Sequence, residues 1–227
     1  MNLDLKNLTI KNEKTHFHNI SFSFKTGNLY FCKGIHGIGK TSLINCLIGL
    51  EAPVNGDIYY GSTNFYKDGR EARYMIRQNM GIIFDKPGLL SNLSIFENLK
   101  LRFSSIKKRK VFHVLGKEKD LEIEDIIKRE LKDINLEDKK DLRPHLLSHG
   151  QLRKVAISRA FLSSPKILIW DDSFEGLSRR DQSFYEKKIL ELKKEKGLIL
   201  CFGNSWISKN ENLIDETIDL NNWRFQG

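Results

Sequence analysis

The sequence predicts an α/β protein whose core is a mostly parallel β-sheet with helices on both faces. Three observations support this fold class. Short apolar runs of strand length recur along the chain, helical periodicity separates them in the second half, and a glycine-rich loop joins one strand to one helix. The 227 residues, 40% apolar and 30% charged, suffice for one large soluble domain or a core with a small attached lobe.

The N-terminal part contains two stretches of alternating apolar residues, 3–10 and 20–24. Alternation is typical of half-buried strands, so these stretches predict a hairpin. The apolar run at 29–32 predicts a third strand, and apolar residues at helical spacing predict a helix that begins near Lys40. The same patterns predict three further elements, a strand at 57–60, a helix at 69–78 and a strand at 80–84.

The chain changes character from about residue 90 to residue 147, where helical patterns replace the alternation. Residues 95–103 predict one helix, and isoleucines at helical spacing from Ile123 onward predict another. This part therefore predicts a mostly helical insertion. The basic run at 107–110 predicts a solvated surface, and a binding patch for nucleic acid or lipid headgroups is the alternative.

Strands and helices alternate again from Gly150 to the end of the chain. This alternation favours a parallel sheet, because parallel strands need crossover connections that helices usually supply. The predicted elements are helices at 151–162 and 179–194 and strands at 166–170, 198–202 and 216–220.

A glycine-rich loop at residues 34–42 fits the pattern G-x-x-x-x-G-K-[ST] and lies between a predicted strand and a predicted helix. Glycine backbones can bring N–H groups around phosphate oxygens, and a helix start adds positive partial charge. A lysine in this pattern reaches the β- and γ-phosphates, and the following hydroxyl ligates Mg²⁺. The candidate nucleotide-binding residues are Gly34, Gly37, Ile38, Gly39, Lys40, Thr41 and Ser42.

Two carboxylates, Asp171 and Asp172, end the apolar run at 167–170. The carboxyl ends of parallel strands meet at one sheet edge, so both lie beside the phosphate loop. Asp171 can hold the Mg²⁺ shell together with Thr41, and Asp172 can orient or deprotonate an attacking water. The structural alternative is that the two aspartates only cap the following turn.

A second helix start follows Leu147, with Ser148 in the N-cap position and Gly150 and Gln151 in the first turn. A hydroxyl, a glycine backbone and a helix N-terminus make a second phosphate-binding surface. Since one chain needs one such surface per nucleotide, this one is predicted to serve a nucleotide held by another subunit. The alternative is an ordinary helix cap.

These motifs resemble the ATP-binding subunit of ABC transporters over nearly the whole chain. Residues 34–41 resemble the Walker A motif, 147–151 the signature LSGGQ, and 167–172 the Walker B motif with the catalytic position. The resemblance implies a P-loop NTPase (RecA-like) core with a small antiparallel β lobe and a helical subdomain. The core would comprise residues 1–89 and 150–227, and the helical subdomain about 90–149.

The resemblance also implies ligands and partners. Two ATP molecules with Mg²⁺ would lie in a head-to-tail dimer with a second ABC ATP-binding subunit, identical or different. The segment after Met80 would contact integral membrane permease subunits at the cytoplasmic face of the membrane, where the chain is expected as a peripheral protein. No apolar stretch approaches the roughly 20 residues that cross a bilayer.

Two other functions stay open. One is an ATP-gated clamp on nucleic acid, which the net charge of +9 would suit. ABC-type proteins with that function carry a long coiled coil or two cassettes. Nucleic acid is therefore not an expected partner. The other is a regulatory ABC module without hydrolysis.

Three cysteines in apolar runs predict core packing rather than a metal site or disulfide.

The chain departs from the family pattern at several catalytic positions. These are Asp172 for glutamate, Asp85 for glutamine, residues 203–206 without the switch histidine, Ser178 for aspartate, Lys11 or Asn12 for an aromatic residue, and His149 for glycine. Asp172 and Asp85 are the candidate catalytic residues, and Asp85 is also a candidate Mg²⁺ ligand beside Thr41 and Asp171. Residues that hold the triphosphate remain, whereas those that position water are changed. We therefore expect a chain that binds ATP·Mg²⁺, hydrolyses it slowly and pairs with a catalytically complete subunit.

Overall fold

The computed structural model describes residues 1–11, 16–104, 116–162, 164–171, 174, 176–204 and 211–223. The strands are β1 (Leu3–Lys11), β2 (His16–Phe24), β3 (Leu29–Lys33), β4 (Asn55–Tyr60), β5 (Thr63–Asn64), β6 (Met80–Ile83), β7 (Ile167–Asp171), β8 (Leu198–Gly203) and β9 (Glu216–Asp219). The helices are α1 (Lys40–Ile48), α2 (Gly69–Gln78), α3 (Ile95–Ser104), α4 (Gly116–Asp133), α5 (His149–Phe161) and α6 (Arg179–Lys194).

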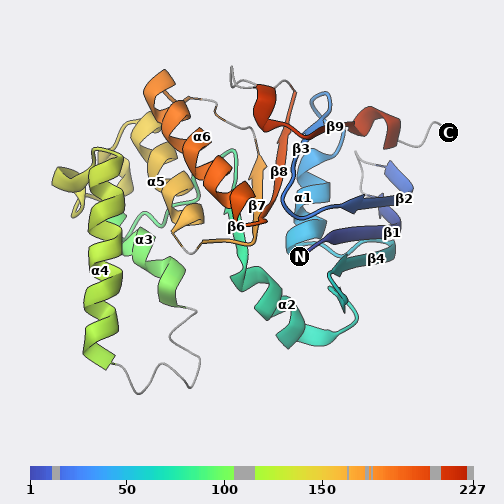
Figure 1. Ribbon diagram of the computed structural model, residues 1–227, viewed down its shortest axis with the longest axis horizontal. Helices are drawn as coiled ribbons and strands as arrows, with labels where there is room; N and C mark the ends of the chain where they lie inside the picture. The colour runs from blue at the N-terminus through green and yellow to red at the C-terminus, as the bar shows by residue number, and fades with distance from the viewer. Residues whose placement is uncertain are drawn as a thin grey trace.

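Two β-sheets organise the described part of the chain (Figure 1). A five-stranded sheet has the order β6-β7-β8-β3-β9, and each pair of neighbours is parallel. A four-stranded sheet has the order β2-β1-β4-β5 and is antiparallel. The predicted parallel sheet is therefore confirmed, as are the hairpin of β1 and β2 and the antiparallel sheet that the resemblance implied.

The helices lie on both faces of the parallel sheet (Figure 1). Helix α1 lies between the two sheets, whereas α5 and α6 cover the other face and α3 and α4 lie beyond them. Strand β3 shows how one strand serves both cores, because Tyr30 and Cys32 pack in the core around α1 and Leu29 and Phe31 pack in the core against the other helices. The parallel sheet lies between these two cores, and the carboxyl ends of its strands position the loops that follow.

A bulge in β1 explains why its apolar spacing changes from two residues to three between Leu5 and Leu8. Asn7 has φ 49°, a left-handed conformation that asparagine adopts more readily than most residues. The extra residue returns Leu8 to the same face as Leu5, so that both stay buried. A Cβ at Gly56 on β4 would lie 2.3 Å from the Asn7 carbonyl oxygen, so the close approach of the two strands requires glycine there.

The cysteines are free and buried, which confirms core packing. Burial, with a smaller contribution from the Glu51 carboxylate, raises the pKa of Cys46 to about 12.

The basic run at 107–110 lies outside the described residues, so its predicted role is untested. Across the described ranges, no helix combines the length and apolar character that spanning a bilayer requires.

Candidate nucleotide-binding site

The glycine-rich loop connects β3 to α1 and has the backbone geometry of a phosphate cradle. Gly37 and Gly39 have φ values of 80° and 112°, which side-chain-bearing residues rarely adopt. Gly39 is the N-cap of α1 and supplies no side-chain acceptor to the first turn. The N–H groups at this helix start can therefore face an anion, with the helix dipole favouring negative charge.

The Lys40 side chain lies across this loop. Its ammonium nitrogen is 2.7 Å from the Gly34 carbonyl oxygen, 3.2 Å from the Ile35 carbonyl oxygen and 2.8 Å from Asn204 Oδ1. Asn204 follows β8, so the contact joins the ends of two neighbouring parallel strands. A bound triphosphate would compete with these acceptors for the ammonium group.

The other loop residues divide into structural and exposed ones. Ile38 is only 3% exposed and packs in the core, so its side chain anchors the loop and only its backbone can contact a phosphate. A Cβ at Gly34 would lie 2.7 Å from the Ile38 side chain, which requires glycine at position 34. Thr41 is exposed and Ser42 is partly buried. The Thr41 hydroxyl is thus accessible to a metal ion bound with phosphates.

Two of the predicted carboxylates, Asp171 and Asp85, follow or end neighbouring strands of the parallel sheet. Asp171 is the last residue of β7, is 8% exposed and pairs in register with Phe202 of β8. Asp85 follows the adjacent strand β6 and is exposed. Thr41 and Asp171 offer the oxygen ligands that Mg²⁺ prefers, so this donor set fits the ion. Asp172 lies outside the described residues, so the structure gives no position for the predicted water-orienting carboxylate.

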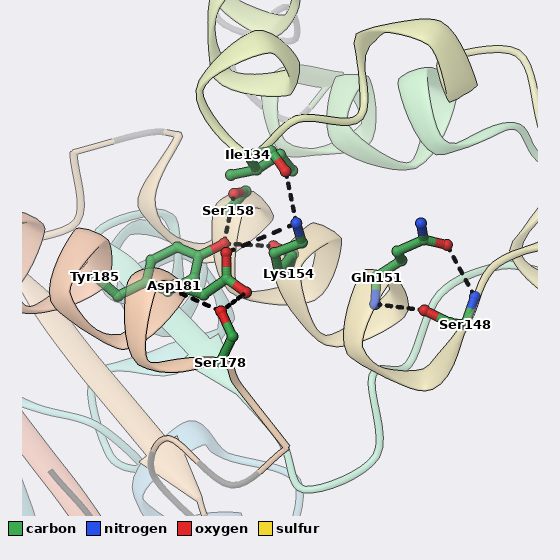
Figure 2. Close-up of polar contacts among 8 residues, drawn as sticks. All are labelled: Ile134, Ser148, Gln151, Lys154, Ser158, Ser178, Asp181 and Tyr185. Carbon is green, nitrogen blue, oxygen red and sulfur yellow. Dashed lines mark hydrogen bonds and ion pairs between the residues drawn. The ribbon is translucent and has the colours of Figure 1, made fainter.

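The second helix start is a capping box at the N-terminus of α5. The Gln151 N–H donates to Ser148 Oγ at 3.4 Å, and the Ser148 N–H donates to Gln151 Oε1 at 3.0 Å (Figure 2). The predicted N-cap role of Ser148 is confirmed. Ser148 and His149 are exposed, and Gly150 is partly buried, so this helix start lies at the surface where a second subunit can reach it.

A polar network that the sequence did not predict ties α5 to its neighbours (Figure 2). The Lys154 ammonium donates to the Ile134 carbonyl oxygen at 2.7 Å and lies 3.7 Å from the Asp181 carboxylate. Asp181 in turn binds Ser178, the N-cap of α6, at 2.6 Å. The Tyr185 hydroxyl donates to the Lys154 carbonyl oxygen at 3.0 Å, and burial raises the pKa of Tyr185.

Arg153 is the second unpredicted residue at the site. It is 2% exposed and donates to the carbonyl oxygens of Phe84, Asp85 and Asp171. A basic residue one turn into a helix normally predicts an exposed side chain, so the sequence carried no signal for this burial. The contacts join α5 to the two strand ends that carry the predicted metal ligands.

The chain is similar to proteins of the ABC transporter family. The model of that family matches residues 17–175. A putative hemin import ATP-binding protein of Staphylococcus haemolyticus is 33% identical over 161 residues, which cover 70% of this chain and 67% of that protein. A methionine import ATP-binding protein of Vibrio vulnificus is 33% identical over 176 residues, 78% of this chain but 47% of that protein, so the chain spans about half of its length.

Solved structures show the same fold. An ATP-binding subunit of an ABC transporter superimposes with a TM-score of 0.80 at 23% identity, covering 97% of this chain and 87% of that one. The cbiO1 subunit of Clostridium perfringens gives a TM-score of 0.71 at 25% identity, covering 96% and 84%. A dimeric bacterial ABC transporter cassette gives 0.78 at 22% identity, covering 96% and 94%.

The family match covers more than half of the chain and includes the glycine loop, the strands from β3 to β7 and helix α5. Both predicted helix starts are present, at the N-termini of α1 and α5, and Asp171 ends β7. The chain therefore belongs to the ABC transporter family and has the fold of an ATP-binding cassette.

Proposed function

We propose that this chain is the ATP-binding subunit of an ABC transporter and couples ATP binding, with slow hydrolysis, to the movement of a substrate through separate membrane subunits. The observation that carries this proposal is the glycine loop, whose lysine ammonium lies across the loop beside the ends of β3 and β8. The relatives in bacteria are ATP-binding proteins of import systems, which supports a role in transport rather than on nucleic acid.

In this proposal the phosphate groups are held by residues of the loop and of the first turn of α1. Backbone N–H groups of Gly37, Gly39 and Lys40 would surround the phosphates, and the Lys40 ammonium would exchange its present acceptors for phosphate oxygens. Thr41, Asp171 and Asp85 would hold Mg²⁺, which would neutralise charge on the phosphates. Gly34 and Ser42 complete the candidate set.

The proposed dimer places Ser148, Gly150 and Gln151 of one chain against the nucleotide of the other. The exposure of this helix start supports the arrangement, because an internal helix cap would leave nothing for a partner to contact. Gln151 already uses its side-chain oxygen in the capping box, and Figure 2 shows its amide nitrogen pointing away from Ser148. The capping box therefore does not use this nitrogen as a donor.

Slow hydrolysis follows from the residues that stand at the water-positioning sites. Asp172 is one methylene shorter than the glutamate of the family, which withdraws the carboxylate by about 1 Å, and a displacement of that size can cost on the order of 10²-fold in rate. Asn204, one of the residues 203–206 that occupy the place of the switch histidine, accepts a hydrogen bond from Lys40 and has no titratable proton.

The rate deficit has a direct test in the purified chain. We expect Asp172→Glu to raise ATP turnover above that of the wild type, because the longer side chain returns the carboxylate to the attacking water. Turnover is measured by phosphate release at saturating ATP and Mg²⁺. A wild-type chain that turns over ATP faster than Asp172→Glu would show that the site is not impaired by the shorter side chain.

The membrane partner is proposed to contact a groove beside β6. This groove has a volume of about 310 Å³ and is lined partly by Met80, Ile82, Phe84 and the exposed Leu101. It lies between the edge strand of the parallel sheet and α3, next to the segment that carries Asp85. Movement of a membrane subunit in this groove would therefore act on the nucleotide site.

Purification of the tagged chain from membranes tests the proposed function. We expect integral membrane chains and a second ABC ATP-binding subunit, or a second copy of this chain, to co-purify in detergent. Recovery of nucleic acid without membrane chains would favour the ATP-gated clamp. Recovery with membrane chains but no ATP turnover, in the wild type or in Asp172→Glu, would favour the regulatory module.

A further inference from the structure

A buried arginine on the second helix start links the two halves of the candidate site. Arg153 lies two residues after Gln151 on α5 and is 2% exposed. A buried guanidinium needs hydrogen-bond acceptors, since removal of a charge from water costs several kcal/mol. The acceptors of the Nη1 and Nη2 groups of Arg153 therefore show what the residue holds together.

The guanidinium lies at the point where β6 and β7 separate. The two strands pair in parallel as far as Ile83 and Trp170. Beyond this pair, Arg153 Nη1 donates to the Phe84 carbonyl oxygen at 2.8 Å, and Arg153 Nη2 donates to the Asp171 carbonyl oxygen at 3.3 Å. One side chain thus bridges the two strands where their own ladder has ended.

The same group fixes the backbone of both predicted metal-site carboxylates. Arg153 Nη1 also donates to the Asp85 carbonyl oxygen at 2.5 Å, while Nη2 holds Asp171. Guanidinium donors point in fixed directions within one plane, so the separation of Asp85 and Asp171 follows from the position of Arg153. The position of Arg153 in turn follows from α5, which begins with the exposed capping box of Ser148.

We infer that Arg153 is a positioning residue that sets the spacing of Asp85 and Asp171 and couples it to the start of α5. A nucleotide of the neighbouring subunit that moves this helix start would then alter the metal site of the chain's own nucleotide. The inference rests on the proposed function, because it takes Asp171 and Asp85 as the carboxylates of the Mg²⁺ site. The inference adds a link through α5 between the nucleotide of the neighbouring subunit and the metal site of this chain. A residue that contacts ATP directly does not provide such a link.

The test measures Mn²⁺ affinity by electron paramagnetic resonance in the complex of the full chain with ATP. We expect Arg153→Met to weaken Mn²⁺ binding by about tenfold or more, as loss of groups that orient metal ligands generally does. We expect Arg153→Lys, which keeps the charge but not the planar donors, to give a smaller loss. ATP affinity measured without metal should change by less than about twofold in both variants, because the loop and Lys40 are untouched.

Arg159→Met serves as the matched control. Arg159 lies on the same helix and donates to the carbonyl oxygens of Gly88 and Pro87, which belong to the same segment but lie beyond the predicted metal ligands. It should therefore keep wild-type Mn²⁺ affinity. Circular dichroism spectra and melting curves of all variants identify any that fail to fold, and Arg153→Lys then decides the inference alone.

Three outcomes overturn the inference or its basis, and they are distinguishable. Wild-type Mn²⁺ affinity in a folded Arg153→Met variant, or in Arg153→Lys when only that variant folds, contradicts a positioning role. Equal losses in Arg153→Met and Arg159→Met show general loosening of α5 instead. Failure of the wild-type chain itself to bind ATP with Mn²⁺ contradicts the proposed function. The contacts of Arg153 would then only stabilise the fold.

Discussion

At the scale of single residues, the contact between Lys40 and Asn204 sets the starting point for nucleotide binding. The ammonium group donates to the Gly34 and Ile35 carbonyl oxygens and to Asn204 Oδ1, at 2.7 to 3.2 Å. Phosphate oxygens must replace these acceptors. Each hydrogen bond that is exchanged rather than newly formed contributes less to affinity than its geometry suggests.

Substitution of Asn204 tests this competition. We expect Asn204→Ala to raise the affinity for ADP by about fivefold, since one acceptor that competes for Lys40 is lost. Asn204→Asp should lower it, because a carboxylate pairs more strongly with the ammonium and repels phosphate. Isothermal titration with ADP and Mg²⁺ measures both. A lower affinity in Asn204→Ala would mean that the amide contacts the nucleotide instead of competing with it.

At the scale of elements, much of the secondary structure could be predicted because it depends on local pattern. The predicted helices at 69–78 and 179–194 coincide with α2 and α6. Strand β2 was predicted only from residue 20, yet it begins at His16, because Asn19 with φ 56° interrupts the alternation after Phe17. Because such an interruption ends the alternating pattern, the part of the strand before it was missed.

The side-chain contacts of α5 could not be predicted, for a different reason. Arg153 meets carbonyl groups of residues 84 and 85, which are 69 and 68 positions away in the chain. Lys154 meets Ile134, which directly follows α4, and Asp181, which lies in the first turn of α6. Periodicity reports which face of a helix is apolar, but a long basic side chain finds its partners only when the tertiary structure has formed.

The capping box of α5 gives a prediction that separates stability from function. Ser148→Ala should lower the free energy of unfolding by about 1 kcal/mol, because one N–H of the first turn loses its acceptor. It should also lower ATP turnover of the assembled transporter. Ser148→Thr keeps the hydroxyl, so it should retain the wild-type free energy of unfolding and the wild-type turnover. Urea unfolding and phosphate release measure the two effects. Full turnover in a folded Ser148→Ala variant would indicate that Ser148 only caps the helix and does not contact a nucleotide.

At the scale of the whole molecule, the parallel sheet gathers the site and the proposed docking groove at neighbouring positions. The glycine loop, Asn204 and Asp171 lie at the ends of β3, β8 and β7, and the groove lies along the edge strand β6. The sequence predicted the first group because strand ends in a parallel sheet share one edge. It could not predict the groove, whose walls come from β6, α3 and α5 together.

A pair of exposed leucines tests the docking groove. Leu101 is 39% exposed and lines the groove, whereas Leu190 is 41% exposed on α6, outside its lining. We expect Leu101→Asp to abolish co-purification with membrane chains and Leu190→Asp to preserve it, because only the first buries a charge against the partner. Equal recovery of membrane chains with both variants would place the membrane contact elsewhere on the molecule.

The most direct test of the central claim is the equilibrium affinity of the purified chain for ATP with Mg²⁺, compared between wild type and Lys40→Ala. The account predicts saturable binding by the wild type. It predicts that Lys40→Ala weakens this binding by about 10- to 100-fold, since charge-assisted hydrogen bonds to the phosphates are lost. Equal affinities in the two proteins, or no saturable binding by the wild type, would contradict a nucleotide site in the glycine loop.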